Sequence, residues 1–204
     1  MLTGDILRRS AERFPDKPAI LWNGTSLSYR ALDEEANQLA NVLLQQDIKK
    51  GSKIGILCSN RTEYGIAFFG VARSGAVIVN VSVLYSADEL AFVLNKAEIE
   101  ILFYEEAFAE KVEGARSNVE KLRMIIGIGG KEEDQFRKFY GAASRDVPDV
   151  SIDEDDPFCM TYTGGTTGRP KGVLVSHRNR IVTAHTVVVE EALDERDVIG
   201  IVTP

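Results

Sequence analysis

The sequence MTYTGGTTGRPKGVLVSH, residues 160–177, carries the densest chemical signal in the chain. Strand-prone runs flank its centre at 158–163 and 173–175, so residues 164–171 are predicted to form a loop between two strands. Glycines there allow positive φ and close approach of the backbone to a ligand, which leaves successive N–H groups free to bind an anion. Hydroxyls and a lysine add donors and charge suited to phosphate oxygens. These predicted polyphosphate-binding residues are Gly164, Gly165, Thr166, Thr167, Gly168 and Lys171.

This loop differs from the common P-loop, in which Gly-Lys is followed by Ser or Thr and then by a helix. Here Lys171 is followed by Gly172 and a strand-prone run. The anion would therefore be held by loop amides, hydroxyls and the lysine, with no helix dipole pointing at it. The simpler alternative is a plain hairpin tip, because glycine-rich turns are common in loops of every kind.

Upstream of the loop, helical and strand patterns alternate as in α/β folds, which favours a mostly parallel sheet flanked by helices. Asn23-Gly24 predicts a hairpin turn, and the pairs Asn60/Glu63 and Ser86/Glu89 resemble capping boxes that begin helices. Expected helices cover 29–46, 60–73, 86–95, 105–119 and 132–139, and expected strands cover 19–22, 26–28, 53–59, 75–83, 99–104 and 124–128.

The patterns divide the chain into three segments. Residues 1–143 are expected to form a first α/β unit, and the polar, acidic stretch 144–156 is expected to be a connector. Residues 157–204 would hold the loop hairpin, a helix at about 176–193 and a strand at 197–202, which together open a second, truncated unit with its own sheet. Such a sheet would have an open apolar edge, so we expect self-association.

Composition limits the function classes. The chain has 204 residues, 44% of them hydrophobic, and a net charge of −7, which suits a globular protein with a substantial core. The acidic balance argues against non-specific nucleic-acid binding, which requires Lys and Arg against phosphates. No apolar run is long enough for a transmembrane segment. Cys58 and Cys159 lie in separate apolar runs and are expected to be reduced core thiols, which favours a cytoplasmic setting.

Other polar clusters are expected to be structural. The run DEDD at 153–156 is interpreted as a solvated face, since no further metal ligands accompany it. Ser176 or His177 is expected to begin a helix, and His177 and His185 are poorly spaced for a shared metal. No serine or cysteine nucleophile is identified, so no catalytic residue is assigned.

YTGGTTGRPKGV, residues 162–173, resembles the phosphate-binding signature of the adenylate-forming (ANL) superfamily, which includes acyl-CoA synthetases, luciferases and peptide-synthetase adenylation domains. The flanking DDP and SHRN are similar to phrases in acyl-CoA synthetases. AERFPDKPAI, LSYRALDEEANQLANVL and GVARSGAVIVNVSVLYSADELAFVLN resemble the family's opening, first long helix and Gly-Ala region. Gly164 stands where many members have serine, as is frequent among long-chain acyl-CoA synthetases. The resemblance implies part of the N-terminal domain of the adenylate-forming fold.

The resemblance also implies a function. An ATP-dependent carboxylate–CoA ligase activates a fatty or other carboxylic acid as an acyl-adenylate and then forms the CoA thioester, with ATP, Mg²⁺ and CoA as cofactors. Thr163 would contact phosphate and Mg²⁺, the stretch Gly164 to Gly168 would wrap the β and γ phosphates, and Lys171 would contribute charge as pyrophosphate departs. In the family, the adenine and ribose contacts and the small C-terminal domain come after the position of Pro204, so the chain alone is expected to be inactive.

Two alternatives stay open. One is an aryl-CoA or amino-acid-adenylating relative within the same superfamily. The other is a noncatalytic nucleotide-binding or interaction module that keeps the fold without turnover.

Overall fold

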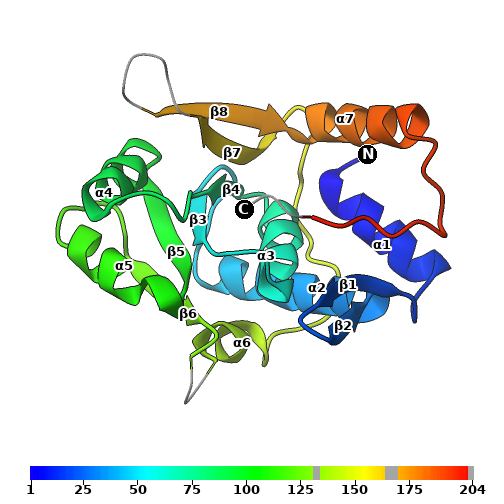
Figure 1. Cartoon of the computed structure of the whole chain (residues 1–204), viewed down its shortest axis with the longest axis horizontal. Helices are drawn as coiled ribbons and strands as arrows, with labels where there is room; N and C mark the ends of the chain where they lie inside the picture. Colours follow the sequence, from blue (N-terminus) through cyan, green and yellow to red (C-terminus); the bar gives the residue numbers. More distant parts are fainter. Residues whose placement is uncertain (131–133, 164–169, 202–204) are drawn as a thin grey trace.

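The computed structural model describes residues 1–130, 134–163 and 170–201 and has an α/β architecture (Figure 1). A six-stranded sheet with the order β6-β5-β3-β4-β7-β8 lies between two layers of helices, and β1 and β2 form a separate two-stranded ribbon. The helices are α1 (Thr3–Arg13), α2 (Tyr29–Gln45), α3 (Thr62–Arg73), α4 (Ala87–Lys96), η1 (Glu106–Phe108), α5 (Ala109–Arg116), α6 (Gln135–Tyr140) and α7 (His177–Glu190). The strands are β1 (Pro18–Trp22), β2 (Thr25–Ser28), β3 (Lys53–Leu57), β4 (Val77–Asn80), β5 (Ile99–Glu105), β6 (Met124–Ile128), β7 (Pro157–Thr163) and β8 (Lys171–Ser176).

Parallel pairing dominates the sheet, as the alternation of patterns predicts. The pairs β3–β4, β3–β5, β5–β6 and β4–β7 are all parallel, and only β8 runs antiparallel, against β7. One apolar cluster joins α2, α3 and α6 to one face of this sheet, and a second cluster joins α4 and α5 to the other face. The mostly parallel α/β class is therefore confirmed.

Local signals account for several element starts. Asn23 and Gly24 both have positive φ, 47° and 75°, in the turn between β1 and β2. The Ser86 hydroxyl accepts from the Glu89 amide at 3.3 Å while the Glu89 carboxylate accepts from the Ser86 amide at 2.8 Å, which is the predicted capping box. The expected box at Asn60 is wrong, because α3 begins after Arg61 and no side chain caps it.

The expected second sheet is also wrong. Strand β7 pairs with β4 through Ile78 and Cys159 and through Asn80 and Thr161, so the hairpin completes the first sheet. The physical reason lies in the connector. Side-chain amides on α2 donate to backbone carbonyls of residues 141–146, which holds the returning chain against α2 and directs it to the apolar edge of β4. The residues that supply these amides are Asn37, Gln38 and Asn41.

The expected terminal strand at 197–202 is not observed in the part of the chain that the structure describes, where residues 197–201 have no strand structure. Helix α7 ends at Glu190, and Ala192 then takes a left-handed conformation with φ 51°. Val198 and Ile201 are 78% and 72% exposed, so no neighbouring strand covers them in the described residues. The predicted helix at 105–119 is shorter too, since β5 continues to Glu105 and α5 starts only at Ala109.

Candidate functional site

The candidate site lies at the carboxyl end of β7, on the side of the sheet that α3 covers. Side chains alternate along a strand, and the alternation here is fixed by packing. Met160 and Tyr162 pack against the cluster under α4 and α5, whereas Cys159 belongs to the cluster under α3. Thr161 and Thr163 therefore share the α3 side with Cys159. In open parallel sheets, ligands bind outside the carboxyl ends of the strands, so this end of β7 is where a substrate is expected.

Strand β8 extends this surface. Its residues Lys171 and Val173 lie opposite Thr163 and Thr161 in the antiparallel ladder, so all four side chains face the same way. All four residues are exposed. We call this surface the hairpin face; its residues are Thr161, Thr163, Lys171 and Val173.

The structure thus brings together two of the residues singled out in the sequence. Thr163 and Lys171 are cross-strand partners at the end of the hairpin, so both side chains leave the same face of the sheet. Gly164, Gly165, Thr166, Thr167 and Gly168 lie outside the described residues. A hydroxyl is one acceptable Mg²⁺ ligand, but Mg²⁺ binds chiefly through carboxylates, water and substrate phosphates, so Thr163 alone fits only a metal that phosphate oxygens also hold.

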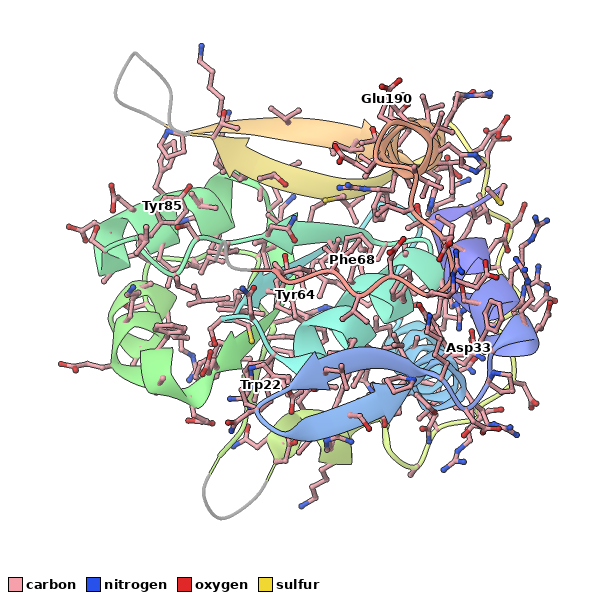
Figure 2. All side chains as sticks on the ribbon, turned by 45° about the vertical axis from the view of Figure 1, so that its right-hand side comes forward. Trp22, Asp33, Tyr64, Phe68, Tyr85 and Glu190 are labelled. Carbon is pink, nitrogen blue, oxygen red and sulfur yellow. The ribbon has the colours of Figure 1, made fainter. Side chains whose placement is uncertain are left out.

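A hydrogen-bonded group supports the middle of the hairpin face. The Tyr64 hydroxyl on α3 donates to the Asn80 side-chain oxygen at 2.7 Å, and the Asn80 amide donates to the Thr161 hydroxyl at 3.1 Å and to the Cys159 sulfur at 3.4 Å. Burial raises the pKa of Tyr64 to about 12, so the hydroxyl keeps its proton at neutral pH. Figure 2 shows α3, with Tyr64, in the middle of the molecule between the β1–β2 ribbon and the β7–β8 hairpin.

Sequence reasoning missed this group. Tyr64 is part of the apolar stripe of α3, together with Phe68 and Val71, and a residue of such a stripe is predicted to lie in the core. The available signal is Asn80, a polar residue that directly follows the apolar run Val77, Ile78 and Val79 of β4. An amide side chain at the carboxyl end of a parallel strand is a candidate for a ligand site. Here the Asn80 amide donates to Thr161, so it contacts the hairpin face.

His177 is structural, as the sequence indicates. Its Nδ1 accepts from the Thr3 amide at 3.2 Å, and its ring stacks on Phe158 with centroids 5.0 Å apart. Burial lowers its pKa to about 4, so the imidazole is neutral at pH 7. The Ser176 hydroxyl accepts from the Asn179 amide at 3.2 Å and caps α7, which confirms the predicted helix start.

The acidic stretch before β7 is used in ion pairs. Asp156 pairs with Lys50 at 2.5 Å, and Arg178 pairs with Glu154 and Asp155 at 2.7 and 2.6 Å. Within the ranges that the structure describes, no three His, Cys, Asp or Glu side chains are grouped as a metal site. These carboxylates are therefore engaged in anchoring the connector and α7.

Both cysteines are free and buried, which confirms two core thiols in place of a disulfide. Burial raises the pKa of the Cys58 thiol to about 12 and also raises that of Cys159, so neither provides a thiolate nucleophile. None of the described helices is both long and apolar enough to cross a membrane.

Comparison with known proteins adds an independent finding. The family model described as AMP-binding enzyme matches residues 7–204. The medium/long-chain-fatty-acid–CoA/3-oxocholest-4-en-26-oate–CoA ligase of Mycolicibacterium smegmatis is 31% identical over 182 residues, which cover 86% of this chain and 33% of that protein. The chain therefore spans about a third of the length of the curated relatives it matches.

Solved structures agree with this comparison. The anthranilate CoA ligase AuaEII, in complex with anthranoyl-AMP, superimposes with a TM-score of 0.85 and 26% identity, covering 91% of this chain and 36% of that one. A fatty acyl CoA synthetase of Mycobacterium tuberculosis gives a TM-score of 0.77 and 27% identity, covering 86% and 34%.

Proposed function

The chain belongs to the family of AMP-binding enzymes, and we propose that it is the N-terminal part of an ATP-dependent carboxylate–CoA ligase. The observation that supports this most is the pairing of Thr163 with Lys171 at the carboxyl end of β7, on either side of the glycine- and threonine-rich stretch. The substrate class we propose is a fatty or related carboxylic acid, because the M. smegmatis relative is a medium/long-chain-fatty-acid–CoA ligase.

The proposed reaction has two steps. In the first, a carboxylate oxygen of the acid attacks the α-phosphorus of ATP, the bond from that phosphorus to the bridging oxygen breaks, and pyrophosphate leaves. In the second, the sulfur of CoA attacks the acyl carbon, the bond from that carbon to the phosphate oxygen breaks, AMP leaves, and the thiol proton passes to solvent. Mg²⁺, when bound, neutralises phosphate charge. No covalent bond to the enzyme is required, so positioning and charge neutralisation carry the catalysis.

The residues of this chain would act on the phosphates. Lys171 would supply a positive charge to the β and γ oxygens, and the Thr163 hydroxyl would contact phosphate and Mg²⁺. The stretch Gly164 to Gly168, which lies outside the described residues, would supply backbone amides to the same phosphates. Asn80 holds Thr161, two residues before Thr163, and so fixes the strand that leads to the phosphates.

A noncatalytic nucleotide-binding module is the second candidate. We expect these residues not to release pyrophosphate from ATP with any fatty acid. An aryl acid is a further alternative to a fatty acid, since a structural neighbour is an anthranilate CoA ligase. A cytoplasmic setting and self-association through exposed apolar residues remain part of the proposal.

Calorimetry with pyrophosphate and Mg²⁺ tests the proposed site. We expect Lys171→Ala to weaken binding about tenfold, the cost of one charge-assisted hydrogen bond. The matched control is Lys96→Ala, which removes an exposed lysine from the last turn of α4, away from the hairpin. Equal affinities for the original chain and Lys171→Ala would contradict the assignment.

A further inference from the structure

Arg180 faces the inside of the molecule from α7. It lies one helical turn after His177, so both side chains leave the same face of the helix. Its guanidinium carbon is 6.0 Å from the centroid of Phe158, the ring on which His177 stacks. Phe158 also contacts Phe68 of α3 edge-on at 5.3 Å. Arg180 is therefore directed toward the layer between the sheet and α3.

Two residues earlier, Arg178 behaves differently. Its guanidinium donates to both oxygens of Asp155, at 2.6 and 3.0 Å, and pairs with Glu154 at 2.7 Å at the surface. Arg180 forms no ion pair with any carboxylate of the described residues, and its Nε is buried without a hydrogen-bond acceptor there. A buried donor of a charged group is costly to leave unpaired, so an acceptor from outside the described residues is expected.

The groups around Arg180 are polar but neutral. Burial raises the pKa of the Cys159 thiol and of the Tyr64 hydroxyl, and the nearby Arg180 charge opposes both increases. Tyr64 and Cys159 are joined through Asn80 to Thr161 of the hairpin face. A guanidinium among neutral partners lacks a counter-charge, and its planar fork of donors matches a carboxylate.

Arg180 and Lys171 stand at opposite ends of one surface. Arg180 acts on the Cys159 thiol through its charge and a side-chain hydrogen bond. Lys171 pairs with Thr163, four residues farther along β7. At the rise of a strand this separation is about 13 Å, and both ends lie on the α3 side of the sheet. ATP and an acid substrate require two anion-binding groups on one surface, and Lys171 and Arg180 are two cations on the same side of the sheet.

We infer that Arg180 is a carboxylate-binding residue that holds the acid substrate at the inner end of the hairpin face, opposite the phosphates at Lys171. This inference rests on the proposed function, and it assigns the acid, not the nucleotide, to α7. It predicts that the charge of the ligand matters more at Arg180 than the length of its chain.

Calorimetry with sodium octanoate, and with methyl octanoate as the uncharged probe, tests the inference on the chain itself. Octanoate is expected to bind and methyl octanoate to bind at least about tenfold more weakly. Arg180→Gln should lose that discrimination, Arg180→Lys should keep part of it, and the control Arg178→Gln should leave it unchanged. Equal octanoate binding by the original chain and Arg180→Gln would overturn the inference.

Two further readouts separate the outcomes. The Arg180 Nε–H resonance of the unmutated chain should shift with octanoate and not with methyl octanoate, which keeps the test valid if Arg180→Gln fails to fold. Pyrophosphate affinity should be the same in Arg180→Gln as in the original chain. Pyrophosphate binding without octanoate binding would overturn the role of Arg180 while leaving the proposed function intact, whereas loss of pyrophosphate binding in Lys171→Ala alone supports the proposed function separately.

Discussion

The strands β3 to β6 and the hairpin β7–β8 with α7 differ sharply in how they are covered. Side chains such as Ile54 and Phe103 in the first region are fully buried, on a sheet packed by helices on both sides. In the second region, β8 is exposed along its first four residues, and His177 is the only buried residue of α7 among the described residues. The first region is therefore stabilised by its own packing. The second region lies along one border of the molecule (Figure 1), and its exposed side chains can meet ligands or further protein.

The largest expected effect separates the two regions by stability. Phe103 of β5 is fully buried and contacts Phe136 edge-on at 5.0 Å. Phe103→Ala should lower the free energy of unfolding by about 3–5 kcal/mol because it removes a large core side chain and leaves a cavity. Val173→Ala on the hairpin face should change it by less than about 0.5 kcal/mol. Urea unfolding measures both, and similar losses would abolish the distinction.

The next largest effect concerns His177, the buried residue of α7, and the pH dependence of stability. The folded pKa of His177, about 4, is below its unfolded value of 6.5, so the unfolded state binds more protons between these values. The contribution of neutral His177 to the free energy of unfolding is fully present above pH 6.5. It is lost as the pH falls toward 4, which lowers the free energy of unfolding by up to roughly 3 kcal/mol. The charges of Asp156 and Asp5 oppose this lowering of the His177 pKa, while the N-terminal ammonium adds to it.

Unfolding free energy measured from pH 7 to pH 4 tests this effect. His177→Gln should flatten the part of the pH dependence that the imidazole contributes, and His185→Gln, at an exposed position of the same helix, should not. An unchanged slope in His177→Gln would show that the helix is anchored by other contacts.

A smaller effect is expected when a glycine in the packed region is replaced by alanine and compared with the same replacement at an open position. A Cβ at Gly55 of β3 would lie 2.9 Å from the Ile99 side chain and 3.0 Å from that of Leu102, whereas Gly200 has nothing within 4 Å. Gly55→Ala should destabilise the protein by about 1–3 kcal/mol through overpacking. Gly200→Ala serves as the control and should be close to neutral in the same urea experiment.

The smallest effect concerns association, and it sharpens the comparison from the exposed side. Val173 and Leu174 of β8 are 49% and 52% exposed, at an edge of the sheet. We expect weak dimers through this edge, since unpaired strands recruit other chains, and Val173→Lys should weaken them. Light scattering after size exclusion measures this; a monomer at high concentration would contradict the expectation of self-association.

The sequence by itself determined the class of the fold and several of its local turns and helix starts. Alternating periodicities predict a mostly parallel sheet, the pair Asn23-Gly24 predicts its turn, and Ser86 with Glu89 predicts the start of α4, because each is a local signal that neighbouring residues decide. Lys171 could be named from the composition of the predicted loop, whereas Thr163 is named through the resemblance to the adenylate-forming superfamily; both roles are proposals.

Only the tertiary structure decided which strands share a sheet and which polar residues meet. Strand β7 joins β4, against the expectation of a second sheet, because amides of α2 hold the connector on a path to that edge. Tyr64, Asn80 and Arg180 come from three elements, the consecutive α3 and β4 and the distant α7, and no periodicity links them. Their convergence depends on long-range packing of α3 and α7 on the sheet, which a local pattern does not encode.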